Sequence, residues 1–367
     1  MKSKILFILH LPPPVHGAAM MGQYIHDSRL INESFNCHYI NLTTARNLED
    51  IGRLSARKIK DFFCLLWNIR KTIKAFHPNL VYVTPNAGGK AFYKDFIVVE
   101  MLKSLGCKIV LHYHNKGVSK HQNRLLDNLL YRSFFSHVKV ILLADTLYQD
   151  ICKYVQRKNV LICSNGIPQT KLDVHTMESR YEGTPHLLFL SNLIESKGIL
   201  ILLDACKILN NQGWTFICDI VGSETDEISV KRLTSEIESR ELKDIVHYQG
   251  RKYGKDKAFY LKQASLFVFP SFYSKECFPL VLLEAMQYHL PCISTNEGGI
   301  PEIIEDGQTG FIVEKRNPQA LVDKIVYYLT HPEQCKIMGD AGYERYLQQF
   351  TLKKFEHRMK EILTECL

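Results

Sequence analysis

Short apolar runs rich in β-branched and aromatic residues alternate with longer amphipathic stretches along the whole chain. In the first half the runs fall at residues 5–11, 37–41, 80–84, 108–112, 138–143 and 160–163. In the second half they fall at residues 187–190, 215–221, 245–248, 266–269, 292–294 and 311–313. Continuous apolar strands separated by helix-length segments are typical of parallel sheets covered on both faces. The pattern therefore predicts an α/β protein with two Rossmann-like, doubly wound sheets.

The polar segment 168–185 lacks periodicity and separates the two halves of this pattern. A chain of 367 residues also exceeds one typical domain. We therefore expect an N-terminal domain over residues 1–170, a linker over 171–185 and a second domain over 186–348. An amphipathic helix is expected over 349–367. Ligands of such sheets bind beyond the carboxyl ends of the strands, so we expect the site in a cleft between two facing domains.

The most informative stretch follows the run 266–269 and reads SFYSKECFPLVLLEAMQYHLPCISTNEGGIPE, residues 271–302. Proline is favourable at the first position of a helix, so a helix is predicted from Pro279 to about His289. Its first amides lack intrahelical acceptors and attract anions such as a diphosphate. Glu276 then lies before the helix, within reach of sugar hydroxyls, and Glu284 lies inside it, within reach of a ribose. The alternative is a surface helix with two solvated glutamates.

Three further loops follow predicted strands and contain small residues. Gly298 and Gly299 open a second short helix, whose first amides are expected to be free to bind a ligand. The loop 12–19, PPPVHGAA, allows a ligand to approach the backbone closely, or forms a simple turn. The loop 85–89, PNAGG, contains Asn86 and follows the third of the apolar runs.

The block ECFPLVLLEAMQYHLPCIST followed by GGIPEII resembles the signature of the retaining glycosyltransferases of family 4. These enzymes have the GT-B fold, a Glu-x7-Glu motif and a Gly-Gly-x-Pro-Glu loop. The resemblance covers nearly the whole chain and is strongest over residues 189–313. It implies metal-independent transfer of a hexose from a nucleoside diphosphate sugar to a hydroxyl acceptor, with retention of configuration and no other cofactor. It also implies a last helix that returns to the first domain.

The resemblance also assigns roles to individual residues. Glu276, His114 and Lys197 are implied to be catalytic, with Lys197 neutralising the donor pyrophosphate. The implied donor-binding residues are Gly17, Asn192, Arg251, Phe278, Pro279, Leu280, Val281, Glu284, Gly298 and Gly299. The acceptor side is implied to include His16, Asn86 and His112, and His112 is also the alternative to His114. Asn192 replaces the usual arginine and so removes one positive charge from the diphosphate site. Arg251 contacts the base or phosphate in this interpretation, or is an ordinary exposed arginine.

Composition limits the compartment and the partners. Eleven cysteines without a C-x-x-C pair fit reduced thiols in a cytosolic protein better than a disulfide framework. The N-terminal run fits a first strand better than a signal peptide, and no run reaches the roughly 18 apolar residues of a membrane span. The net charge of +8 indicates phosphate-bearing ligands, an anionic membrane or simple solubility.

The basic segment 50–76 either lies on an anionic membrane or packs its apolar side on the sheet. We expect a cytoplasmic enzyme, peripheral to the inner face of the membrane, that acts on glycan or lipid-linked acceptors of cell-surface polysaccharide or glycolipid assembly. No nucleic-acid partner is expected. The alternatives are a GT-B-fold sugar-nucleotide epimerase or hydrolase, and a non-catalytic nucleotide-sugar-binding subunit.

Overall fold

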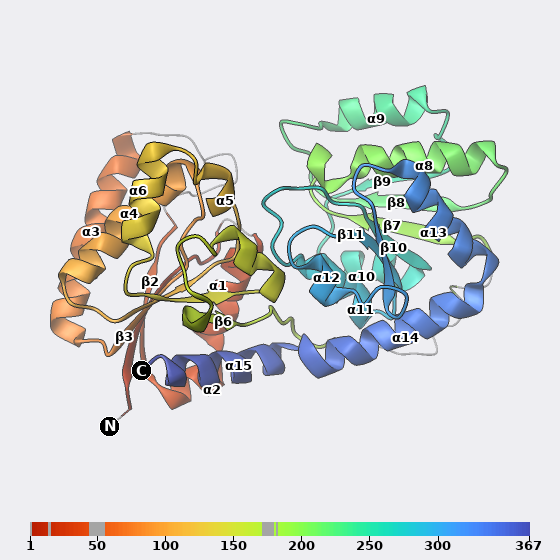
Figure 1. The fold of residues 1–367 in the computed structure, drawn as a ribbon. Coiled ribbons are helices and arrows are strands. Elements are labelled where there is room, and N and C mark those ends of the chain that lie inside the picture. The colour runs from red at the N-terminus through yellow and green to blue at the C-terminus, as the bar shows by residue number, and fades with distance from the viewer. Residues whose placement is uncertain (1, 14–15, 44–55, 171–179, 181–182) are drawn as a thin grey trace. The chain divides into compact units, whose positions relative to one another are not determined.

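A computed structural model describes residues 2–13, 16–43, 56–170, 180 and 183–367. The chain divides into two compact units (Figure 1). Unit 1 contains residues 1–165 together with the last segment, Leu352–Leu367. Unit 2 contains Gly166–Thr351. Most of the expected linker, 171–185, lies outside the described residues, as do residues 50–55 of the basic segment.

Unit 1 is built on a parallel six-stranded sheet in the order β2-β1-β3-β4-β5-β6. The strands are β1 (Lys4–Leu9), β2 (Asn36–Asn41), β3 (Leu80–Val83), β4 (Ile109–His112), β5 (Lys139–Leu142) and β6 (Val160–Ile162). Almost every residue of β1, β3, β4 and β5 is buried, as is expected of strands covered on both faces.

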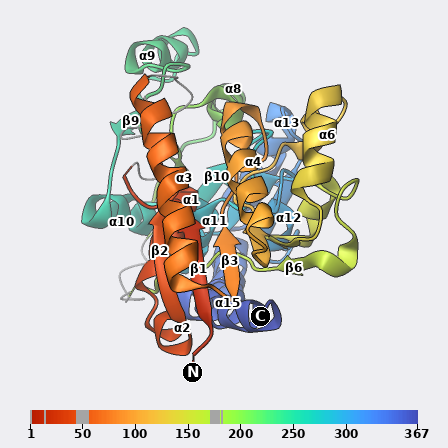
Figure 2. The ribbon, with the colours of Figure 1, turned by 90° about the vertical axis from the view of Figure 1, so that its left-hand side faces the viewer.

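Helices cover both faces of the first sheet. They are α1 (Gly17–Asp27), α2 (Arg29–Ser34), α3 (Ala56–Phe76), α4 (Gly89–Ser104), α5 (Val118–His121), α6 (Leu125–Phe134) and α15 (Leu352–Glu365). Right-handed crossovers place α1 on one face and α3, α4 and α6 on the other. Figure 2 shows α3, α4 and α6 side by side. The last helix, α15, packs against α2, so the chain returns to unit 1 as predicted.

Unit 2 repeats the architecture with the strand order β12-β11-β10-β7-β8-β9. Its strands are β7 (His186–Leu190), β8 (Ile217–Val221), β9 (Val246–Gly250), β10 (Leu266–Phe269), β11 (Cys292–Thr295) and β12 (Gly310–Val313). All twelve predicted strands are therefore present at their expected places, and all sheet pairs are parallel.

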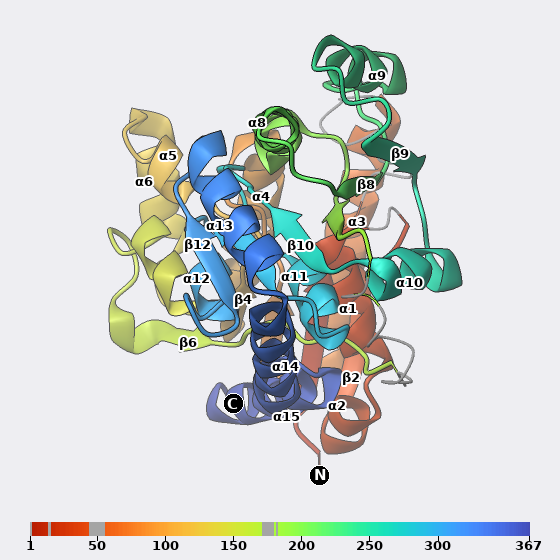
Figure 3. The same cartoon turned by 90° about the vertical axis from the view of Figure 1, so that its right-hand side faces the viewer.

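The helices of unit 2 are α8 (Ile199–Asn211), α9 (Val230–Ser239), α10 (Gly254–Gln263), α11 (Leu280–Gln287), α12 (Ile300–Ile303), α13 (Pro318–Thr330) and α14 (Pro332–Gln349). Helix α8 packs beside α13, and α11 packs beside α14 (Figure 3). None of the eleven cysteines, all of which the structure describes, forms a disulfide. Among the described helices, none combines the length and the apolar character that crossing a membrane requires.

Candidate active site

The predicted catalytic residues Lys197 and Glu276 meet in unit 2. The Lys197 ammonium lies 2.5 Å from Glu276 Oε2, and the side chains of both residues are more than four-fifths buried. Ser271 donates a hydrogen bond of 3.3 Å to the same carboxylate oxygen. The two residues are 79 positions apart in the sequence, so the fold alone brings these charges together.

Tight backbone packing fixes the position of Lys197. It ends a 3₁₀ turn, Glu195–Lys197, and Gly198 follows with φ +92°. A Cβ on Gly198 would lie 2.2 Å from the carbonyl oxygen of Pro270, so only glycine allows this approach. The Phe272 amide also donates to the Ser196 carbonyl oxygen at 2.8 Å. The Lys197 ammonium then sits 4.6 Å from the centre of the Tyr273 ring, which holds the cation by a cation–π contact.

Helix α11 begins four residues after Glu276. It starts at Leu280, one residue later than predicted, because Pro279 has an extended backbone and forms the N-cap. The amides of Leu280 and Val281 occupy the first helical positions, where helix geometry supplies no acceptor. Phe278 is buried against Phe350 within unit 2. The positive end of α11 thus follows Glu276 closely in the chain, and the Lys197 ammonium contacts the carboxylate of Glu276.

Glu284 lies in α11 and pairs with a different lysine. Its Oε1 atom is 2.7 Å from the ammonium of Lys257, which α10 contributes. Its Oε2 atom is buried and finds no hydrogen-bond partner among the described residues. A buried carboxylate oxygen without a partner is energetically costly, and a ligand hydroxyl would satisfy it. The sequence gives no sign of Lys257, because α10 contains no recognisable motif.

In the Gly298–Gly299 loop, amides that were expected to be free are hydrogen-bonded to backbone carbonyl groups. Gly298 has φ +58°, and a Cβ there would lie 2.3 Å from the Glu276 carbonyl oxygen. This loop therefore packs directly against the backbone of Glu276. The Gly299 amide donates to the Cys277 carbonyl oxygen at 2.7 Å, and the Ile300 amide donates to Glu297. These two amides were expected to be free for a ligand, but the Gly299 amide joins the two loops and the Ile300 amide closes a turn within its own loop.

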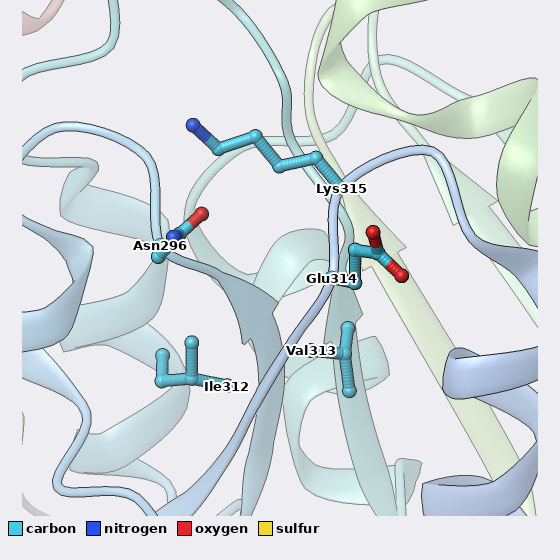
Figure 4. A pocket seen from close by; sticks show the side chains of 5 residues that line it. All are labelled: Asn296, Ile312, Val313, Glu314 and Lys315. Carbon is cyan, nitrogen blue, oxygen red and sulfur yellow. The ribbon is translucent and has the colours of Figure 1, made fainter.

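A hollow of about 540 Å³ opens beyond the carboxyl ends of β11 and β12. It is lined by Asn296, Ile312, Val313, Glu314 and Lys315 (Figure 4). The Lys315 ammonium is 2.7 Å from the buried Glu297 carboxylate, immediately before Gly298. The hollow is open to solvent and lies beside the Gly298 loop. It places another cation at the same edge of the second sheet.

Two predicted donor-binding residues of unit 2 are exposed. Asn192 follows β7, and its carbonyl oxygen accepts a hydrogen bond from the Ile194 amide. The Arg251 guanidinium lies over the Tyr253 ring at 4.5 Å. Neither contacts Glu276 or Glu284 through a described hydrogen bond or ion pair. Both follow strand ends, where side chains from neighbouring loops converge on ligands.

In unit 1, the end of β4 places two histidines in contact. The rings of His112 and His114 are 4.2 Å apart. His112 is completely buried, and its Nδ1 atom is 2.5 Å from the Tyr82 hydroxyl. His112 is therefore inaccessible to a ligand here, and the prediction that it lies on the acceptor side is not supported. It supports the ring of His114 instead.

His114 has the properties of a binding side chain. Within the described part of unit 1, neither of its ring nitrogens has a hydrogen-bond partner, although both are buried. Burial lowers its pKa from 6.5 to about 3, and the nearby His16 adds to this effect. The imidazole is therefore neutral at physiological pH, with one donor and one acceptor available for a hydroxyl group.

The first loop of unit 1 lies in the same histidine cluster. His16 is the N-cap of α1 and accepts a hydrogen bond of 3.3 Å from the Ala19 amide. Its ring centre is 6.0 Å from that of His10, whose pKa burial lowers to about 3. Gly17, the first residue of α1, is exposed and has no atom within 4 Å of an added Cβ. His16 and Gly17 thus form the accessible edge of this cluster.

Asn86 serves mainly to hold the loop after β3. Its backbone and side-chain N–H groups both donate to Asp95 Oδ2 at 2.8 Å. Asn115, just beyond β4, donates to Asn86 Oδ1 at 3.4 Å and accepts from the Ala87 amide at 2.7 Å. Asp95 is completely buried. This network, in which Asp95 and Asn115 were not predicted, joins the ends of β3 and β4.

Comparison with known proteins shows what the chain resembles. The family model described as glycosyl transferases group 1 matches residues 174–345. The chain is 28% identical over 226 residues to the amylovoran biosynthesis glycosyltransferase AmsK of Erwinia amylovora, covering 60% of this chain and 54% of AmsK. It is 24% identical over 333 residues to an uncharacterized glycosyltransferase of Haemophilus influenzae, covering 89% and 88% of the two chains.

Solved structures extend the likeness in fold to the whole chain. Anabaena HepE, solved in complex with UDP, has a TM-score of 0.76 at 17% identity and covers all of both chains. At this identity the likeness concerns the fold. The alignments span about half the length of AmsK and of several other curated relatives.

Proposed function

We propose that the chain is a retaining glycosyltransferase, because its residues 174–345 match the family model described as glycosyl transferases group 1. It moves a hexose from a nucleoside diphosphate sugar to a hydroxyl acceptor. The observation that carries the proposal is the Lys197–Glu276 pair, in which Glu276 belongs to the loop that opens α11. A cation and free helical amides suit a diphosphate, and a carboxylate suits sugar hydroxyls.

The proposed mechanism follows from where charge develops. In the transition state the sugar gains oxocarbenium character while the leaving diphosphate gains negative charge. Lys197 and the amides of Leu280 and Val281 stabilise the leaving group. Glu276 orients the sugar through its hydroxyls and stabilises the positive charge on the ring. The acceptor attacks on the face that the diphosphate leaves, and the departing phosphate takes the acceptor proton.

The remaining residues are assigned by their surroundings. Glu284, with one unpartnered carboxylate oxygen, accepts a hydrogen bond from the ribose. His114 is neutral, so it hydrogen-bonds a hydroxyl of the donor sugar without adding charge. Gly17 and His16 contribute the donor and acceptor contacts of the first unit. Arg251 is assigned to the base or phosphate.

The substrates are proposed at the level of their class. AmsK is named for the biosynthesis of amylovoran, and a Staphylococcus aureus relative is named for the biosynthesis of capsular polysaccharide. These names support a glycan acceptor. A lipid-linked glycan on the cytoplasmic side of the membrane is the form of acceptor that we propose. The UDP complex of HepE makes uridine diphosphate sugars the first donors to test.

A turnover assay with purified full-length protein tests the proposal. We expect nucleotide release from a sugar nucleotide to require an acceptor, with retention at the transferred anomeric carbon. Glu276→Ala should lower turnover about 100-fold, the range for removing one group that stabilises transition-state charge. Lys207→Ala, which removes a lysine from an exposed ion pair, is the matched control and should keep full activity. Release without an acceptor would instead indicate a hydrolase, and binding without turnover a non-catalytic subunit.

A further inference from the structure

Helix α3 presents its large apolar side chains to solvent. Phe63 is 65% exposed and Trp67 is 66% exposed, and Ile59 lies on the same stripe. These residues recur every four positions, so they share one side of the helix. Ile69 and Ile73 are buried on a different side of the helix, roughly 100° round from the stripe. Helix α3 therefore packs within unit 1 through its buried side chains, and the exposed stripe is available to a partner.

Basic residues border and extend this apolar stripe. Lys60, Arg70, Lys71 and Lys74 are all exposed. The helical repeat of about 100° per residue places Lys60 and Lys71 beside one edge of the stripe, and Arg70 and Lys74 in line with it beyond Trp67. The Lys71 ammonium lies 5.2 Å from the centre of the Trp67 ring. Asp61 is the one acidic residue in the sequence of α3, and it is half-buried.

The neighbouring helices extend the same surface. On α6, Leu125 is 84% exposed, and Leu126 and Leu129 are also largely exposed. On α4, Tyr93 and Ile97 are exposed one turn apart. The Tyr93 hydroxyl donates to Asp127 of α6, which turns that carboxylate away from solvent. Figure 1 and Figure 2 both show α3, α4 and α6 together on one face of unit 1.

We propose that this three-helix face of unit 1 docks on an anionic lipid bilayer. Aromatic and leucine side chains on such a surface enter the interface between headgroups and acyl chains, while lysine and arginine side chains reach the anionic headgroups. A second copy of the chain is a poor occupant, because like charges on the two faces would repel each other. The inference concerns a different surface from the donor site and does not depend on the proposed activity.

Vesicle flotation of the full-length protein tests the docking. Vesicles of equal parts phosphatidylglycerol and phosphatidylcholine should carry the protein at low salt, and pure phosphatidylcholine vesicles should carry much less. The triple variant Lys60→Glu, Lys71→Glu, Lys74→Glu should weaken binding at least about tenfold. Lys231→Glu, Lys255→Glu, Lys262→Glu makes the same charge change with exposed lysines of unit 2 and should leave binding nearly unchanged.

A second pair of triple variants tests whether the apolar side chains insert into the bilayer. Ile59→Ser, Phe63→Ser, Trp67→Ser should also weaken binding at least about tenfold. Val230→Ser, Phe259→Ser, Ile337→Ser removes three exposed apolar side chains from unit 2 and should not weaken it. A loss of binding that is equal in the two sets would contradict the assignment to this face. Unchanged thermal unfolding temperatures would show that both sets still fold.

The two tryptophans of the chain offer a direct readout. Trp67 lies on the proposed face, whereas Trp214 lies in unit 2. In a Trp214→Phe variant, anionic vesicles should shift the Trp67 emission to shorter wavelength, and brominated lipids should quench it. In a Trp67→Phe variant, the Trp214 emission should not respond. Absence of a Trp67 response, or concentration-dependent dimerisation without vesicle binding, would overturn the proposal.

Discussion

Lys197 and Glu276 form a buried pair in which each charge depends on the other. Removing one partner leaves the second charge buried without compensation, which we expect to cost about 1–3 kcal/mol of unfolding free energy. The double variant Lys197→Met, Glu276→Gln should lose less stability than the sum of the two single variants. Chemical denaturation of the four proteins measures this coupling. Additive losses would mean that the two charges are not energetically coupled, which would contradict this expectation.

The two glutamates of the Glu-x7-Glu motif should affect different parts of the donor. Glu284→Ala should weaken binding of the nucleoside diphosphate alone about tenfold, because a hydrogen bond to a charged group is lost. Glu276→Ala should leave that affinity nearly unchanged and weaken binding of the complete sugar nucleotide. Isothermal titration with both ligands distinguishes the two residues. The reverse result would exchange their assigned roles.

The buried histidines of unit 1 predict how stability depends on pH. Burial lowers the pKa of His10 and of His114 to about 3 in the folded protein, against 6.5 as the usual value. The unfolded chain therefore binds more protons between pH 6.5 and 3, so stability falls as the pH is lowered through this range. The slope contributed by each histidine approaches about 1 kcal/mol per pH unit.

Denaturation at several pH values measures this slope. His114→Asn should make the stability of unit 1 less dependent on pH below 6.5. Equal slopes in the wild-type protein and the His114→Asn variant would contradict the buried, neutral state of His114.

At the scale of elements, the loop after β11 links the two parts of the main motif. Gly298 combines a positive φ of +58° with a close approach to the Glu276 carbonyl. Gly298→Ala should therefore destabilise unit 2 and weaken donor binding, since Glu276 has to shift. Gly307→Ala is the matched control, because φ there is +75° but an added Cβ meets no atom within 4 Å. It should cost only the backbone strain, about 1 kcal/mol.

Features determined by the local sequence pattern could be predicted, whereas contacts that depend on tertiary packing could not. The interior strands are buried on both faces and leave continuous apolar runs. The edge strands β2, β6 and β9 are only partly buried. All twelve strands were located from the sequence. The start of α11 was displaced by one residue, because proline suits both the N-cap backbone and the first helical position. The partners of the site were harder to predict. Lys257, Asp95 and Asn115 meet their partners only through tertiary packing, and nothing near them in the sequence marks the contact.

The hydrogen bond of the Gly299 amide also could not be predicted from the sequence. Glycine-rich loops at helix starts supply free donors in general. Here the close approach that Gly298 allows lets the Gly299 amide bond the Cys277 carbonyl. Only the path of the two loops reveals that this donor is already used.

In the whole molecule, the two units have different proposed roles. Unit 2 holds the ion pairs proposed to bind the donor, and unit 1 holds the histidine cluster and the face proposed to dock on lipid. The last helix, α15, belongs to unit 1 although α14 belongs to unit 2. The two activities are therefore separable by variants that leave the other unit unchanged.

We propose above all that the Lys197–Glu276 site binds a nucleoside diphosphate sugar. Isothermal titration of the full-length protein with a panel of these donors, beginning with uridine diphosphate sugars, tests it most directly. We predict saturable binding of at least one donor, weakened at least about tenfold by Lys197→Ala and unchanged by Lys207→Ala. If the folded protein binds no donor, or if Lys197→Ala leaves donor binding intact, the Lys197–Glu276 site is not the donor site.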